Sequence, residues 1–136
     1  MYRIGQEEIE ELSKVVSARN LFKVNKGLKE SEQVETKLKE IFKTDFPIFM
    51  SSGHAALTSA LVAMGIGPGD EVIVPANTYI ASILSILQAG LKPVLCEPSW
   101  ESCNINPEMI EKLITTRTKA IMAVHLYGRC ADIPQI

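Results

Sequence analysis

The sequence predicts an α/β fold in which a mostly parallel sheet carries helices on both faces. Short apolar segments, expected to be strands, alternate along the chain with segments of helical spacing. The strand segments are apolar through most of their length, which is typical of parallel strands that are covered on both faces. Turns that contain glycine, proline or asparagine separate these segments and mark where each element ends.

Two helices are expected before the sheet. Apolar residues recur at helical spacing over residues 7–18, which predicts an amphipathic helix. After a polar connector over 20–29, Ser31 is suited to cap a second helix. The apolar stripe of this second helix consists of Val34, Leu38, Ile41 and Phe42. We therefore expect residues 1–45 to form an N-terminal helical segment, followed by a domain over 46–136.

The expected elements of that domain follow one another closely. Strands are predicted over residues 46–50, 71–75, 92–97 and 120–126. One helix is expected between the turn at 51–54 and Gly65, and a second over 79–89, with Gly90 as its C-cap. A third begins at Asn106, because Pro107 suits the first position of a helix.

Composition excludes several classes of protein. The chain has 136 residues, of which 46% are hydrophobic and 22% charged, and its net charge is −2. This balance offers no basic surface for nucleic acid, and no apolar run reaches the roughly 20 residues that span a bilayer. The polar first residues do not resemble a secretory signal. The three cysteines form neither a CxxC pair nor an even set, so we expect a reduced, cytoplasmic protein without nucleic-acid or membrane partners.

The stretch over residues 51–82 is the most informative for function. The turn Ser51-Ser52-Gly53-His54 opens directly onto an apolar helix, and a helix N-terminus of this kind leaves backbone N–H groups that suit a phosphate. Tyr79 follows the next strand, where an aromatic side chain can cover a ring attached to that phosphate. The pair points to pyridoxal phosphate. The alternative is a helix simply capped by a serine, and a tyrosine packed at a helix start.

An ordered set of motifs adds a family resemblance. SSGHAAL, LVAMGIGPGDEVIVPANTYIAS, GLKPVLCEP and NINPEMIEKLITTRTKAIMAVHLYG follow one another, and together the set resembles the DegT/DnrJ/EryC1/StrS family of pyridoxal-phosphate-dependent sugar aminotransferases. The two N-terminal helices are also similar to that family. The resemblance implies part of the large domain of the aspartate-aminotransferase (type I) fold, and a homodimer with small-molecule substrates.

The resemblance also implies roles for individual residues. Ser52, Gly53 and His54 stand where the family has its Ser-Gly-Thr phosphate turn, and Tyr79 stands where an aromatic covers the pyridine ring. His54 replaces the threonine, so it keeps the backbone donor, loses the hydroxyl and can add a ring N–H or a charge. Further residues are expected near cofactor or substrate. They are Asn77, Thr78, His125 and Tyr127, although a structural role for His125 is an equal alternative.

Members of the family are longer, so this chain is expected to correspond to about their first third. The lysine that holds the cofactor as a Schiff base, and the aspartate that pairs with the pyridine nitrogen, are then expected beyond residue 136. No catalytic residue and no metal ligand is predicted within the chain, and the chain by itself is expected to be inactive.

Three functions fit these expectations. The first is transfer of an amino group from glutamate or glutamine to a keto-sugar, typically a nucleotide-linked one. The second is a sugar dehydratase of the same family, in which the Schiff-base lysine is replaced. The third is a non-catalytic truncated module. The residue at the lysine position separates the first two.

Overall fold

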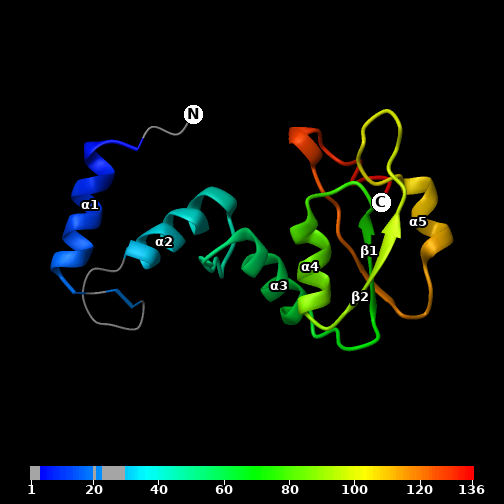
Figure 1. Cartoon of the computed structure of the whole chain (residues 1–136), viewed down its shortest axis with the longest axis horizontal. Coiled ribbons are helices and arrows are strands. Elements are labelled where there is room, and N and C mark those ends of the chain that lie inside the picture. The colour runs from blue at the N-terminus through cyan, green and yellow to red at the C-terminus, as the bar shows by residue number, and fades with distance from the viewer. Residues whose placement is uncertain (1–3, 20, 23–29) are drawn as a thin grey trace. The chain divides into compact units, whose positions relative to one another are not determined.

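The computed structural model describes residues 4–19, 21–22 and 30–136. The chain splits into two compact units, Met1–Phe49 and Met50–Ile136, which are described separately (Figure 1). The division at residue 45 that the sequence predicts stays a prediction. Among the described residues, no helix is long and apolar enough to cross a membrane.

The first unit contains the two helices predicted from the apolar spacing. α1 spans Gln6–Ser17 and α2 spans Glu30–Phe42. Ser31 lies inside the first turn of α2, so the prediction that it caps this helix is wrong. Glu30 and Glu32 also lie in this turn, where carboxylates favour the positive end of the helix dipole. Most of the predicted connector over 20–29 lies outside the described residues.

The segment 46–50 is irregular, and the prediction of a strand there is wrong. A strand needs a neighbour to satisfy its backbone hydrogen bonds, and none of the described strands pairs with this segment. Phe46 and Ile48 therefore stay 88% and 70% exposed. The backbone N–H of Phe49 instead donates to the Glu35 carboxylate at 2.8 Å.

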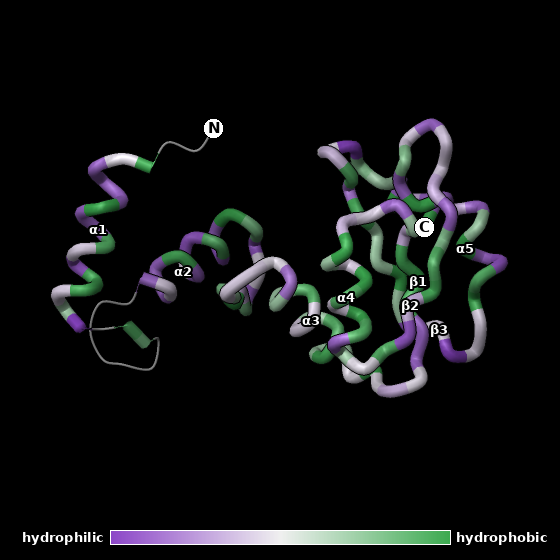
Figure 2. The backbone as a smooth tube through the Cα atoms, in the orientation of Figure 1, coloured by the Kyte–Doolittle hydropathy of each residue, from purple (hydrophilic) through white to green (hydrophobic). Residues whose placement is uncertain are grey.

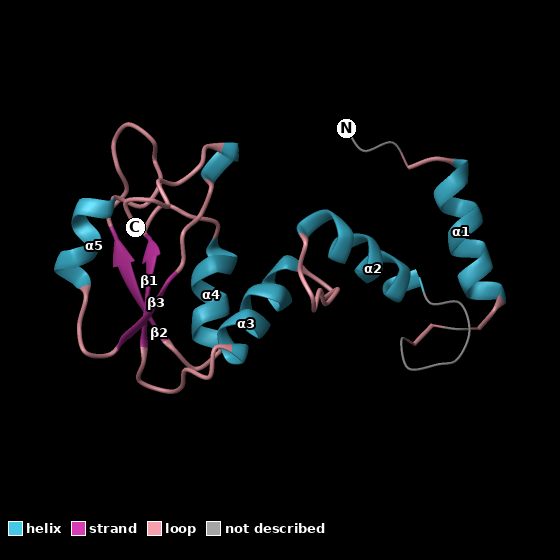
Figure 3. Cartoon of the chain, turned by 180° about the vertical axis from the view of Figure 1, so that it is seen from behind, coloured by secondary structure: helices cyan, strands magenta, loops and turns pink. Residues whose placement is uncertain are grey.

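Three parallel strands form the sheet of the second unit, in the order β2-β1-β3. They are β1 (Glu71–Pro75), β2 (Lys92–Cys96) and β3 (Thr118–Ile121). Figure 3 shows β1 and β2 pointing in one direction. β3 begins and ends earlier than the sequence predicts. It ends early because the chain leaves the sheet after Met122, whose N–H makes a last 2.8 Å bond to the Ile73 carbonyl. The chain then forms the short 3-10 helix η1 (Leu126–Gly128).

Helices cover both faces of this sheet, as predicted. They are α3 (Gly53–Ala63), α4 (Ile80–Gln88) and α5 (Pro107–Leu113). Figure 1 shows α4 and α5 on opposite sides of β1 and β2, and Figure 2 shows apolar residues along β1 and α4. Successive side chains of a strand face opposite ways. Val72 and Val74 thus pack with Leu61, Ile86 and Leu91, whereas Ile73 packs with Cys96, Ile105 and Ile110.

Glu71 begins β1 and is the one buried carboxylate among the described residues. The Thr115 hydroxyl donates to it at 2.6 Å, the Arg117 guanidinium at 2.9 Å and the Lys92 ammonium at 3.1 Å. These three donors, Thr115 first, lower the pKa of Glu71 to about 2. The cluster joins the starts of β1 and β2 to the residues that precede β3.

This cluster predicts an acid-sensitive stability. A carboxyl whose pKa is about 2 in the folded state and 4.5 without its partners stabilises the fold fully above pH 4.5. That contribution is lost as the pH falls from 4.5 towards 2. We expect the urea midpoint of unfolding to drop across this window, and to drop less in Glu71→Gln. Equal slopes in the two proteins would contradict the assignment.

Candidate functional site

The turn before α3 is capped by Ser52. The Ser52 hydroxyl accepts from the backbone N–H of Ala55 at 3.1 Å, and the Ser52 carbonyl accepts from that of Ala56 at 3.0 Å. Within the described part of the chain, the N–H groups of Gly53 and His54 have no hydrogen-bond partner. A Cβ added at Gly53 would meet nothing within 4 Å. The turn therefore leaves two backbone donors without a described partner, beside a glycine that crowds no neighbour.

The His54 side chain is held by a residue that the sequence did not single out. Its ring Nε2 is hydrogen-bonded to Oε1 of Gln88, the last residue of α4. Tyr79 immediately precedes α4, so the His54 ring reaches toward the end of that helix opposite Tyr79. The backbone N–H of His54 has no described partner, while Nε2 of its ring is bonded to Gln88.

Tyr79 stands at the N-cap position of α4 with 76% of its surface exposed. Its ring is thus accessible to stack on a ligand. Neighbouring Thr78 shares a 3.0 Å hydrogen bond with the Ser82 hydroxyl, and Asn77 is exposed. No described contact joins Tyr79 to the Ser52–His54 turn.

The loops after β1 and β3 meet at one edge of the sheet, because the two strands are parallel neighbours. The first loop carries Asn77, Thr78 and Tyr79, and the second carries His125 and Tyr127. Nδ1 of His125 accepts from the backbone N–H of Ala131 at 2.9 Å, so a neutral His125 ring carries its hydrogen on Nε2. The edge thus offers an imidazole donor and two exposed phenol rings.

Asn104 joins the loop after β2 to the loop after β3. Its side chain is 2% exposed, and Oδ1 accepts from the N–H of Leu126 at 3.0 Å while Nδ2 donates to the carbonyl of Arg129 at 2.9 Å. The sequence analysis gives Asn104 no role. No local signal was available, since an asparagine in a polar loop is usually solvated.

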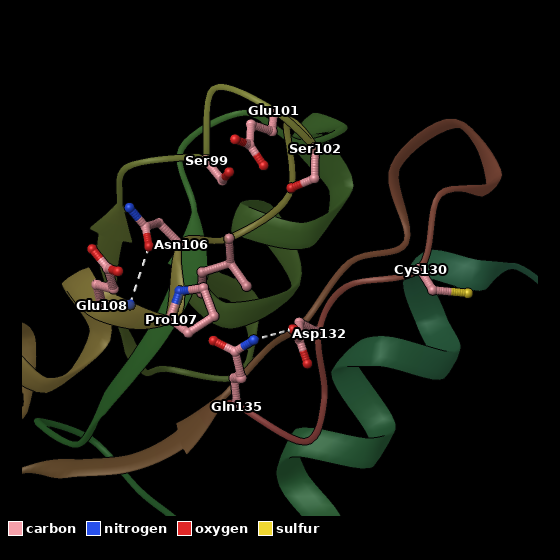
Figure 4. Close-up of a pocket in the computed structure, with 10 residues that line it drawn as sticks. Ser99, Glu101, Ser102, Asn106, Pro107, Glu108, Cys130, Asp132 and Gln135 are labelled. Atoms are coloured by element: carbon pink, nitrogen blue, oxygen red, sulfur yellow. Dashed lines mark hydrogen bonds between the residues drawn. The ribbon is translucent and has the colours of Figure 1, made fainter.

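A pocket of about 410 Å³ opens beside α5 (Figure 4). Its lining consists of Ser99, Glu101, Ser102, Ile105, Asn106, Pro107, Glu108, Cys130, Asp132 and Gln135. None of the predicted site residues is among them. Figure 4 shows the Cys130 thiol pointing away from the other labelled side chains. In the part of the chain that the structure describes, no three His, Cys, Asp or Glu side chains are grouped to hold a metal.

The fold defines a class of protein. The parallel sheet with helices on both faces is that of type I pyridoxal-phosphate-dependent aminotransferases, to which the chain's structural neighbours belong. A model of the DegT/DnrJ/EryC1/StrS aminotransferase family matches residues 3–136. The chain belongs to this family.

Individual relatives make the similarity concrete. A dTDP-3-amino-3,6-dideoxy-alpha-D-galactopyranose transaminase from Aneurinibacillus thermoaerophilus is 50% identical over 107 residues, covering 79% of this chain and 30% of the relative. A GDP-perosamine synthase from Caulobacter vibrioides is 54% identical over 89 residues, covering 65% of this chain and 24% of the relative. The chain thus spans less than a third of the length of either protein.

A solved structure shows the same similarity in three dimensions. NtdA from Bacillus subtilis, with bound cofactor PMP, matches with a TM-score of 0.83 and 34% identity over 97% of this chain and 30% of that protein. PMP is the aminated form of the cofactor that the sequence predicted.

The Ser52 cap generates a prediction. Ser52→Ala removes the acceptor for the Ala55 N–H, which typically costs about 1 kcal/mol of unfolding free energy. Thr58→Ala is the matched control, because its hydroxyl bonds a carbonyl of its own helix at 3.1 Å and caps nothing. We expect chemical denaturation to show a larger loss for Ser52→Ala; equal or smaller loss would contradict the capping role.

Proposed function

We propose that this chain is part of a pyridoxal-phosphate-dependent aminotransferase that moves an amino group from glutamate or glutamine to the keto group of a nucleotide-linked sugar. The observation that carries the proposal is the Ser52-capped turn, in which the N–H groups of Gly53 and His54 have no described partner. Nucleotide-sugar transaminases among the relatives support the substrate class.

Two separate features of this chain suit the two ends of the cofactor, and no described contact joins them. The backbone N–H groups of Gly53 and His54 would bind the phosphate, since a helix N-terminus favours an anion and Gly53 leaves room for it. The exposed Tyr79 ring would stack on the pyridine and exclude water from one face, an aromatic contact worth about 0.5–1.5 kcal/mol beyond burial. When bound, pyridoxal phosphate supplies the carbonyl group that carries nitrogen between donor and acceptor.

Substrate binding falls to the carboxyl edge of the sheet. We assign contacts there to Asn77, Thr78, His125 and Tyr127. The Ala131 N–H holds Nδ1 of His125, so the neutral ring would donate a hydrogen bond from Nε2 to a hydroxyl or carboxylate of the substrate. These contacts would orient the reacting groups rather than exchange protons with them.

The proton-transferring lysine and the aspartate for the pyridine nitrogen belong, in this proposal, to sequence other than residues 1–136, because no lysine here resembles the family's Schiff-base lysine. We therefore propose that the 136-residue chain alone transfers no amine. We further propose that the whole enzyme is a cytoplasmic homodimer, as the resemblance implies.

The test uses the full-length protein. Purified with pyridoxal phosphate, it is expected to bind the cofactor, to convert it to the aminated form with L-glutamate or L-glutamine, and to aminate a nucleotide-linked keto-sugar. Mass spectrometry of the cofactor and the sugar checks each step. Loss of a sugar hydroxyl without amination would instead support the dehydratase. Absence of cofactor binding would refute both.

Tyr79 gives a sharper prediction. Tyr79→Ala should weaken binding of pyridoxal phosphate about tenfold, because the ring contact and its apolar cover are both lost. Tyr79→Phe keeps the ring and should bind within about twofold of wild type. Fluorescence titration of the apo protein measures both constants. Unchanged affinity in Tyr79→Ala would remove Tyr79 from the site.

A further inference from the structure

Asn104 is a buried polar residue whose side chain is hydrogen-bonded to the backbone of another loop. Its amide accepts from the N–H of Leu126 and donates to the carbonyl of Arg129. These two atoms lie on either side of Tyr127. Because the donor and the acceptor of the amide each meet a complementary backbone group, the side chain is satisfied in a single orientation.

The backbone between these two contacts is strained. Tyr127 has φ 52° and ψ 29°, in the left-handed region that residues with a Cβ seldom occupy. Its side chain is 94% exposed, so packing of the ring does not hold the residue in this conformation. The loop is instead held by hydrogen bonds. Two of them, from the Leu126 N–H and to the Arg129 carbonyl, join it to the buried side chain of Asn104.

Asn104 is itself fixed to the core. Its carbonyl accepts from the N–H of Ser99 at 2.8 Å, and its own N–H donates to the Ser102 hydroxyl at 3.2 Å. The next residue, Ile105, pairs with Pro98 in an antiparallel bridge and is buried with Ile73. The Asn104 amide is therefore a fixed attachment point for the loop that carries His125 and Tyr127.

We propose that Asn104 is a positioning residue of the substrate site: its amide holds Leu126 and Arg129 so that His125 and Tyr127 are presented at the carboxyl edge of the sheet. This inference rests on the proposed function, which assigns those two side chains to the substrate. Asn104 touches no substrate itself. It acts on binding through the backbone of the loop.

The test compares Asn104→Ala and Asn104→Asp with wild type in the full-length enzyme. Alanine removes both hydrogen bonds, whereas aspartate keeps an acceptor for the Leu126 N–H and loses the donor to Arg129. Asn106→Ala is the control for loss of a neighbouring asparagine, since the Asn106 side chain caps α5 by accepting from the N–H of Glu108 at 3.1 Å and makes no described bond to the loop around Tyr127. The probe is L-glutamate or L-glutamine, whichever wild type accepts, in the single half-reaction.

Two readouts are needed. Hydrogen exchange of the Leu126 amide should be faster in Asn104→Ala and close to wild type in Asn104→Asp. The substrate concentration at half-maximal rate should rise about tenfold or more in both variants, because the hydrogen bonds that position a binding loop are lost. The affinity for pyridoxal phosphate and the limiting rate should stay within about threefold of wild type. Asn106→Ala should match wild type in both readouts.

The outcomes separate the two proposals. If wild type neither binds the cofactor nor reacts with the amino donor, the proposed function fails and this inference fails with it. If wild type reacts but both Asn104 variants keep its substrate dependence, only the positioning role is refuted. If neither variant folds, Asn104 is a folding residue and the positioning role is likewise refuted.

Discussion

The pairing of β1 with a strand on each side organises the second unit. Val72, Ile73 and Val74 are completely buried, and the backbone between them is hydrogen-bonded to β2 and to β3. Since successive side chains face opposite ways, this one strand supplies both hydrophobic clusters, and a shift of its register by one residue would exchange them. Because the three strands are parallel, all of them end on the same side of the sheet, and the loops that follow them lie together at this carboxyl edge.

The two ends of the sheet bury polar groups for different purposes. At the amino end, Glu71 gathers Thr115, Arg117 and Lys92, which ties together the chain segments that enter the three strands. At the carboxyl end, Asn104 bridges loops that leave two strands. Ligands of open α/β sheets bind beyond the carboxyl ends of the strands. The charged cluster is thus suited to stability, and the neutral amide to holding a binding loop without adding a charge beside it.

Sequence patterns predicted the elements whose stability is local or whose burial is complete. The strands at 71–75 and 92–96 are apolar between clear turn signals, and the helices show apolar faces, caps or a proline at the start. The prediction was wrong for 46–50, because an apolar segment becomes a strand only beside a partner. It misjudged the end of β3, because the loop that follows Met122 leaves the sheet and bonds to Asn104, a residue distant in the sequence.

For the site, the sequence by itself determined the residue types that suit a phosphate and a ring: a serine cap with a following glycine, and an aromatic residue after the next strand. Those features depend on neighbours in the chain, so a turn and a helix start are enough to recognise them. Only the tertiary structure decided that Gln88 holds the His54 ring and that Asn104 anchors the loop around Tyr127. The partners in these contacts are 22 to 34 residues apart in sequence, and only the packing of helices and loops on the sheet brings them together.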